Sequence, residues 1–99
     1  MSKITKSARG EECQIRLPGI CNSNAETVVW CHANGLASGR GMWLKAADML
    51  GAYGCSSCHS AYDRQVKTDL SYEYIQVCFF EGMMRSQRIL IEKELIKIS

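Results

Sequence analysis

The stretch Cys55-Ser-Ser-Cys-His-Ser-Ala-Tyr-Asp-Arg64 decides how this chain folds and what it can bind. It holds a C-x2-C pair, a histidine directly behind the pair, and Asp63 at position i+4 from His59. If the cysteines open a helix, His59 and Asp63 lie one turn apart on one face. A C-x2-C pair at a helix start is a common half-site for tetrahedral zinc. The stretch therefore predicts a structural metal site, with an imidazole and a carboxylate beside it that could hold a second, reactive metal.

Three other interpretations fit the same residues. C-x2-C-H is also the pattern for covalent haem attachment, but that chemistry requires export, and residues 1–20 hold no continuous apolar stretch to serve as a signal peptide. A thioredoxin-like redox pair is expected in a βαβ context, which the pattern lacks. The third alternative is two buried cysteines and a surface histidine with no metal at all. Zinc is favoured over all three because a second cysteine pair lies upstream.

The upstream pair, Cys13 and Cys21, flanks the dipeptide Pro18-Gly19. Pro-Gly is a strong turn signal, so the segment can fold back and bring both thiolates to one metal. The gap between the two cysteines is longer than the about two to four residues usual for paired zinc ligands. The Cys13–Cys21 pair alone is weak evidence for a zinc site, but together with Cys55 and Cys58 it makes a good four-cysteine site. The predicted ligands of one structural Zn²⁺ are Cys13, Cys21, Cys55 and Cys58.

Length and composition indicate one domain, covering residues 1–99. With 46% hydrophobic and 22% charged residues the chain reads as globular rather than disordered. No apolar run approaches the about 18 residues that span a bilayer, so no membrane association is expected. Without a signal sequence, the six cysteines favour the cytoplasm, with Cys31 and Cys78 as free thiols in the core. The formal charge of +2 falls to about zero once four thiolates bind zinc, so nucleic-acid affinity must come from local basic patches.

The hydrophobic pattern predicts an N-terminal arm or helical turn over residues 1–12, a loop at residues 22–25 and a strand over residues 26–32 that ends in His32. Residues 35–41 are glycine-rich, and Arg40 there either contacts a phosphate or belongs to a plain connection. Residues 42–50 are apolar at helical spacing and predict a short helix. These expectations place His32 close in sequence to a glycine-rich loop.

A long helix is predicted from a cap at Asp69 or Ser71 to about Lys97. Gly82 interrupts it, which indicates close packing or a kink at that point. Arg85 and Arg88 share one helical face that either contacts phosphate or is solvated. The helix can pack on its own domain or pair with a second copy to form a homodimer.

In this order the parts resemble the HNH, or His-Me finger, nucleases, and most closely the small prophage-encoded YbcO-like nuclease family. The likeness covers almost the whole chain. It runs through Ala8-Arg-Gly, Cys13, Cys21, Val28-Val29, His32, Cys55-Ser-Ser-Cys-His59, Asp63-Arg64 and Glu81-Gly-Met83.

The resemblance implies a small α+β domain with a treble-clef zinc frame, in which a β-hairpin and a helix (a ββα-metal finger) clasp one divalent metal. It implies a metal-dependent endonuclease that hydrolyses DNA phosphodiester bonds in phage or prophage DNA metabolism, in the cytoplasm of a bacterial host. His32 matches the general base, and a neutral imidazole can take a proton from water at physiological pH. His59 and Asp63 match the ligands of the catalytic metal, Mg²⁺ or Mn²⁺, with Zn²⁺ or Ni²⁺ also compatible. The four cysteines match the structural zinc ligands.

The sequence departs from the HNH pattern at two places. Cys31 stands before the base histidine, where many HNH enzymes carry an aspartate or histidine ligand. The middle asparagine that orients the base is missing ahead of the cysteine pair, and Asp48 is the nearest candidate. The alternative function is therefore a non-catalytic, zinc-stabilised module that binds nucleic acid or protein. A nuclease requires His32, whereas a binding module does not.

Overall fold

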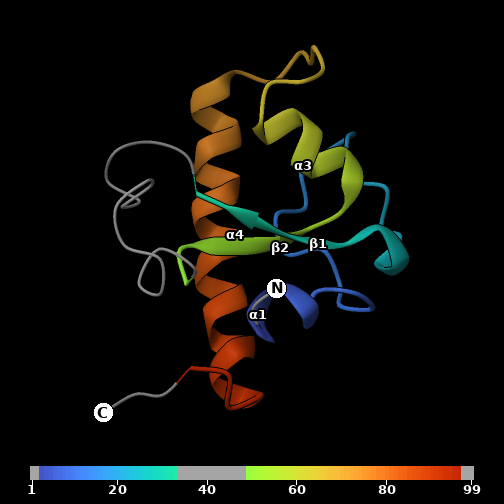
Figure 1. Ribbon diagram of the computed structural model, residues 1–99. Helices are drawn as coiled ribbons and strands as arrows, with labels where there is room; N and C mark the ends of the chain where they lie inside the picture. Colours follow the sequence, from blue (N-terminus) through green and yellow to red (C-terminus); the bar gives the residue numbers. More distant parts are fainter. Residues whose placement is uncertain (1–2, 34–48, 97–99) are drawn as a thin grey trace.

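Two short antiparallel strands, β1 (Val29–His32) and β2 (Gly51–Gly54), lie at the centre of the fold. In this computed structural model, which describes residues 3–33 and 49–96, Val29 pairs with Gly54 and His32 pairs with Gly51. The strand pair crosses the long helix α4 (Tyr72–Glu92) in Figure 1. The helices α3 (Ser56–Tyr62) and α1 (Lys3–Lys6) lie on opposite sides of the strand pair. The predicted small α+β domain with a long C-terminal helix is confirmed.

The free edge of β2 is closed by two segments that are distant in sequence. The backbone N–H of Gln14 donates to the carbonyl oxygen of Tyr53 at 2.8 Å. The N–H of Tyr53 in turn donates to Ser86 Oγ at 3.0 Å, and this fully buried hydroxyl donates to the carbonyl oxygen of Gly82 at 2.6 Å. A buried backbone amide without a partner would be costly, so α4 satisfies the strand as well as covering it.

Gly82 allows this close approach between α4 and the N-terminal segment. A Cβ atom at Gly82 would lie 2.8 Å from the carbonyl oxygen of Gln14 and 3.0 Å from the Cα of Ile15. Both contacts are with backbone, which cannot move aside as a side chain can. Of the two expectations for Gly82, close packing is therefore confirmed.

The long helix starts where it was predicted and ends earlier. The Ser71 side chain caps it by accepting a hydrogen bond from the N–H of Tyr74 at 3.2 Å. The helix ends at Glu92, because Glu94 takes a left-handed conformation (φ 60°) and the N–H of Leu95 bonds back to the carbonyl oxygen of Leu90 at 2.9 Å. The prediction that the helix reaches about Lys97 is wrong.

The predicted strand over residues 26–32 is too long at its N-terminal side. Residues Ala25–Thr27 form a 3₁₀ turn (η1), which the Asn24 side chain caps by accepting a hydrogen bond from the N–H of Glu26 at 3.0 Å. Thr27 Oγ1 also donates to the carbonyl oxygen of Asn24 at 2.8 Å. These local side-chain hydrogen bonds compete with strand pairing, so the strand begins only at Val29.

Several expectations concern residues 34–48 or 97–99 and lie outside the described part of the chain: the glycine-rich loop with Arg40, most of the 42–50 helix, and Asp48. Met49 and Leu50, the last residues of that predicted helix, lie in a turn and bend before β2. The helical turn expected near the N-terminus is present as α1. Within residues 3–33 and 49–96, no helix combines the length and the apolar character that crossing a membrane would require.

Candidate functional site

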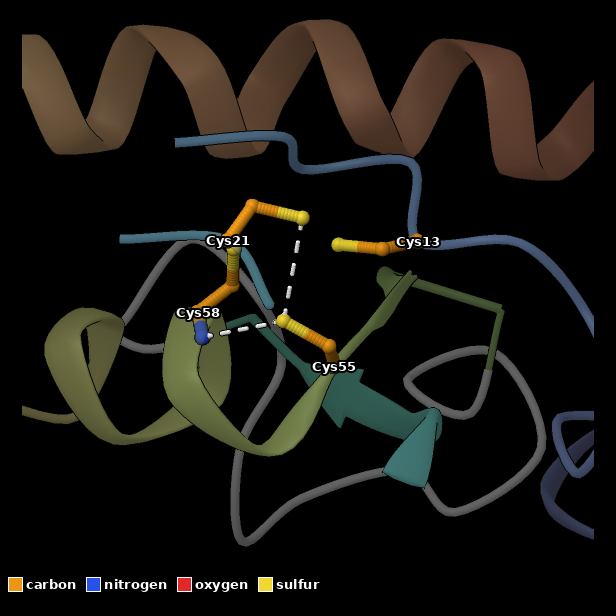
Figure 2. Close-up of side chains that lie close together, drawn as sticks. All are labelled: Cys13, Cys21, Cys55 and Cys58. Atoms are coloured by element: carbon orange, nitrogen blue, oxygen red, sulfur yellow. Dashed lines mark hydrogen bonds between the residues drawn. The ribbon is translucent and has the colours of Figure 1, made fainter. Parts of the chain in front are cut away.

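Four cysteines converge between the N-terminal segment and the first turn of α3 (Figure 2). The Sγ atoms of Cys13, Cys21, Cys55 and Cys58 all lie within 4.8 Å of one another, and those of Cys21 and Cys55 are 3.9 Å apart. Four sulfurs at about 2.3 Å from a tetrahedral zinc ion would be about 3.8 Å from each other. The donor set and its spacing therefore fit zinc, and the four-cysteine cluster predicted from the sequence can bind such an ion.

Backbone turns on both sides of the cluster hold the cysteines in place. Cys55 is the N-cap of α3, and its Sγ accepts a hydrogen bond from the N–H of Cys58 at 3.4 Å. From the other side, the N–H of Leu17 donates to Cys58 Sγ and the N–H of Asn22 donates to Cys55 Sγ, each at 3.4 Å. The predicted turn after Leu17 is present, with the N–H of Cys21 bonded to the Leu17 carbonyl oxygen at 2.9 Å. Amides that point at sulfur favour the thiolate form that a metal requires.

The protonation of the cluster is uneven. A hydrogen bond with the Cys58 thiol lowers the pKa of Cys13 to about 4, because the thiol stabilises a neighbouring thiolate. The same hydrogen bond raises the pKa of Cys58, which acts as the donor. Desolvation by burial raises the pKa of Cys21. All four thiols are free of disulfides, so their sulfurs are available to an ion.

An open groove of about 510 Å³ runs beside the cluster and exposes it on one side. Its walls include two of the predicted zinc ligands. The lining residues are Glu12, Cys13, Arg16, Cys21, Ser23 and Ala25. The groove gives an ion an entry path to the sulfurs.

The two remaining cysteines are core residues, as expected. Cys31 is 0% exposed and Cys78 is 8% exposed. Burial raises the pKa of the Cys31 thiol, and the negative charge of Asp63 raises this pKa further. Because side chains alternate along a strand, Cys31 points to the face of β1 opposite to His32. Cys31 therefore does not supply the metal ligand that many HNH enzymes carry at this position.

His59 and Asp63 meet on the exposed side of α3, as their spacing predicted. His59 Nε2 lies 2.8 Å from Asp63 Oδ2, and their side chains are 38% and 27% exposed. Two ligands at right angles, each about 2.1 Å from one metal, would be about 3.0 Å apart. The contact is a direct polar contact across one turn of α3, and the two side chains are close enough to turn toward one cation in its place.

His32 lies exposed at the end of β1, and α3 packs against both strands of the pair. Within residues 3–33 and 49–96, the four cysteines are the one group of three or more potential ligands close enough to share an ion. His32 is thus not part of a common ligand group with His59 and Asp63, and its role as a base stays a prediction.

An aromatic column that no sequence pattern predicts lies next to His59 and Asp63 in the chain. Tyr62 stacks on Phe79 with ring centroids 3.9 Å apart and also stacks with Tyr72 at 6.4 Å. The guanidinium carbon of Arg64 lies 3.6 Å from the centroid of the Tyr72 ring. These residues come from α3, the following loop and α4, so no local spacing in the sequence signals the contact.

The fold and the cluster define the class as a small α+β domain with a cluster of four cysteines that could bind a metal ion. Over residues 2–95 the sequence matches the family described as "Putative nuclease YbcO", and the chain belongs to this family.

Two relatives and one solved structure support this assignment. Proteins named "Putative nuclease YbcO" from Escherichia coli (strain K12) and "Putative nuclease ybcO" from Enterobacteria phage 82 are each 39% identical over 97 residues, which cover 98% of this chain and 99% of theirs. The structure described as a "putative bacteriophage protein from Escherichia coli str. K-12 substr. MG1655" matches with a TM-score of 0.75 and 37% identity, covering 92% of this chain and 99% of that one. The names support a nuclease-type enzyme in a phage-associated family.

Proposed function

We propose that this protein is a metal-dependent endonuclease of the HNH type that hydrolyses DNA phosphodiester bonds in phage or prophage DNA metabolism within a bacterial host. The observation that carries this proposal is the half-exposed His59–Asp63 pair, with ligand atoms 2.8 Å apart. The pair lies on the helix whose first turn holds Cys55 and Cys58, so a zinc ion there would fix its position. The family name supports nucleic acid as the substrate.

Each residue has a separate role in this proposal. His59 and Asp63 would hold the catalytic cation, Mg²⁺ or Mn²⁺. When bound, that cation neutralises charge on the phosphate and on the leaving oxygen. His32, exposed at the end of β1, accepts the proton of the attacking water on its imidazole. The four-cysteine zinc site, in the treble-clef arrangement implied by the family resemblance, has a structural role only.

A second candidate function rests on Cys31. The buried thiol leaves the position before His32 without an exposed metal ligand, so fewer protein groups surround the cation than in many HNH sites. A zinc-stabilised module that binds nucleic acid or protein without cleaving it agrees with this observation. The two functions differ in whether His32 is needed.

The deciding experiment is cleavage of plasmid and branched DNA by the zinc-loaded protein with added Mg²⁺ or Mn²⁺, beside His32→Ala. We expect His32→Ala to lower the cleavage rate by about 10² or more, because general-base catalysis contributes at least that factor. Its zinc content and thermal unfolding should match those of the unmodified protein, since His32 is exposed and is not one of the four clustered cysteines. DNA binding by both proteins without cleavage by either would favour the binding module instead.

The cation site has an independent test. His59→Ala should abolish Mn²⁺ binding measured by electron paramagnetic resonance, while one zinc ion per chain remains. Retained Mn²⁺ affinity in this variant would mean that His59 and Asp63 do not form the metal site together.

A further inference from the structure

Arg64 occupies an unusual backbone position at the end of α3. The N–H of Arg64 bonds to the carbonyl oxygen of Ala61 at 3.1 Å, and the N–H of Gln65 bonds to that of Ser60 at 2.9 Å. This double closure places Arg64 at the left-handed position (φ 59°), where glycine is the usual residue. A side chain there is unfavourable, and such outliers are a reason to look for a function. Glu94 ends α4 in the same way, so the backbone alone does not single out Arg64.

The ring beneath the side chain distinguishes Arg64 from Glu94. The guanidinium lies 3.6 Å from the Tyr72 ring centroid, and Tyr72 stacks with Tyr62, which stacks on the buried Phe79. The column joins α3 to α4, so the ring that carries the guanidinium is anchored in the core. A guanidinium that lies over an aromatic ring can still offer N–H groups for a bidentate contact with an anion.

Two other arginines of the described chain, Arg16 and Arg85, bond to backbone within the protein, whereas Arg9 and Arg88 are exposed. Arg85 donates to the carbonyl oxygen of Gln14, and Arg16 donates to the carbonyl oxygen of Cys13 and to Gln14 Oε1. Arg64 is exposed, and among residues 3–33 and 49–96 no carboxylate forms an ion pair with it. Its charge is therefore held in place and available.

We propose that Arg64 is a positioning residue that binds a backbone phosphate of the nucleic-acid substrate, next to the phosphate bound at His59 and Asp63. The proposal rests on the proposed function, because the phosphate belongs to the substrate of that nuclease. Arg64 directly follows Asp63 in the chain, which places it next to the proposed cation site. The exposed Lys67 on the same loop adds a second positive charge. The contact is with phosphate and not with a base, so it contributes affinity without sequence preference.

The test measures binding of a fluorescein-labelled DNA duplex by anisotropy, from 50 to 200 mM KCl, with zinc-loaded protein and no added Mg²⁺ or Mn²⁺. Arg64→Gly should weaken binding about fivefold at the lowest salt and reduce the slope of log K against log salt by about 0.9, the value of one phosphate contact. The midpoint temperature of thermal unfolding should not fall, since glycine suits the left-handed position. Arg64→Gln removes the charge but keeps a side chain at this position. It should lose the same affinity, which would show that the loss does not come from an effect of glycine on the loop.

Two matched controls separate charge and backbone effects. Glu94→Gly makes the same backbone change at the end of α4, and Arg9→Ala removes an exposed arginine three residues after α1. Helix α1 lies on the other side of the strand pair from α3 (Figure 1). Each should change the affinity less than twofold. Under cleavage conditions Arg64→Gly should raise KM and leave kcat within twofold.

The outcomes distinguish this inference from the proposed function. Unchanged affinity and salt slope in both Arg64 variants, with clear binding by the unmodified protein, would overturn the role of Arg64 and leave the nuclease proposal standing. A fall in kcat without a change in KM would also overturn it. Failure of the unmodified protein to bind DNA would refute both proposals.

Discussion

Ser86 and Gly82 show how single residues of α4 determine the position of the sheet. Ser86 is a fully buried hydroxyl that gives the N–H of Tyr53 its hydrogen-bond acceptor, while Gly82 lets the backbone of Gln14 approach. The close packing at Gly82 follows from a glycine inside a predicted helix, so this feature could be anticipated. The role of Ser86 could not, because a serine within a helix signals neither burial nor a partner on a distant strand.

Replacement of Gly82 by alanine tests the contact. Helix propensity alone predicts that Gly82→Ala stabilises the protein by about 1 kcal/mol. We expect the opposite sign, a loss of about 1–3 kcal/mol in the free energy of unfolding, because the new methyl group would overlap the backbone of Gln14 and Ile15. Chemical denaturation of the zinc-loaded protein measures the change. Glu81→Ala, at the exposed neighbouring position, is the control and should stay within about 0.5 kcal/mol.

At the level of elements, the sequence predicted helix starts better than helix ends. Side-chain caps at Cys55 and Ser71 open α3 and α4 as expected. Both helices end at a non-glycine residue with a positive φ, Arg64 and Glu94, and no residue type marks those stops. The late start of β1 has a similar cause, since the Asn24 cap is formed by local hydrogen bonds that compete with β-propensity.

The first turn of α3 carries the prediction that belongs to this scale. Cys55→Ser removes one of four sulfurs, while the serine hydroxyl can still cap α3 by accepting from the N–H of Cys58. We expect it to lose zinc and cooperative unfolding, because structural zinc supplies folding free energy to a domain this small. Zinc content by plasma mass spectrometry and circular dichroism are the measurements. Cys78→Ala deletes a core thiol and should keep one zinc ion per chain; a folded Cys55→Ser protein with full zinc content would refute the four-cysteine site.

At the level of the whole molecule, contacts between residues at short, regular sequence spacing could be predicted, whereas contacts that depend on how helices and strands pack together could not. The four-cysteine cluster followed from two spaced pairs and a turn, and the His59–Asp63 contact followed from helix periodicity. The aromatic column under Arg64 depends on how α3 packs against α4, which no short pattern encodes. The relation of His32 to the metal pair depends on the packing of β1 against α3, so it stays a prediction.

The outer face of α4 bears on association between chains. It exposes several large apolar side chains within the described residues, namely Tyr74, Val77, Phe80, Met84 and Ile91. The homodimer expected from the sequence stays a prediction. Light scattering would test it directly by giving twice the chain mass of 11.1 kDa.

The division of the six thiols into a cluster of four and two isolated core residues equips the protein with its own reporter of unfolding. A chelator in native buffer frees four sulfurs for reaction with a maleimide as the metal leaves, and because zinc supplies folding free energy the two core thiols should follow as the domain opens. Cys31 and Cys78 should label only as fast as the whole domain opens, because both are buried and neither belongs to the cluster. Intact-mass spectra over time would then resolve a four-adduct species from a six-adduct species. A direct jump to six adducts would mean that metal loss and global unfolding are one event.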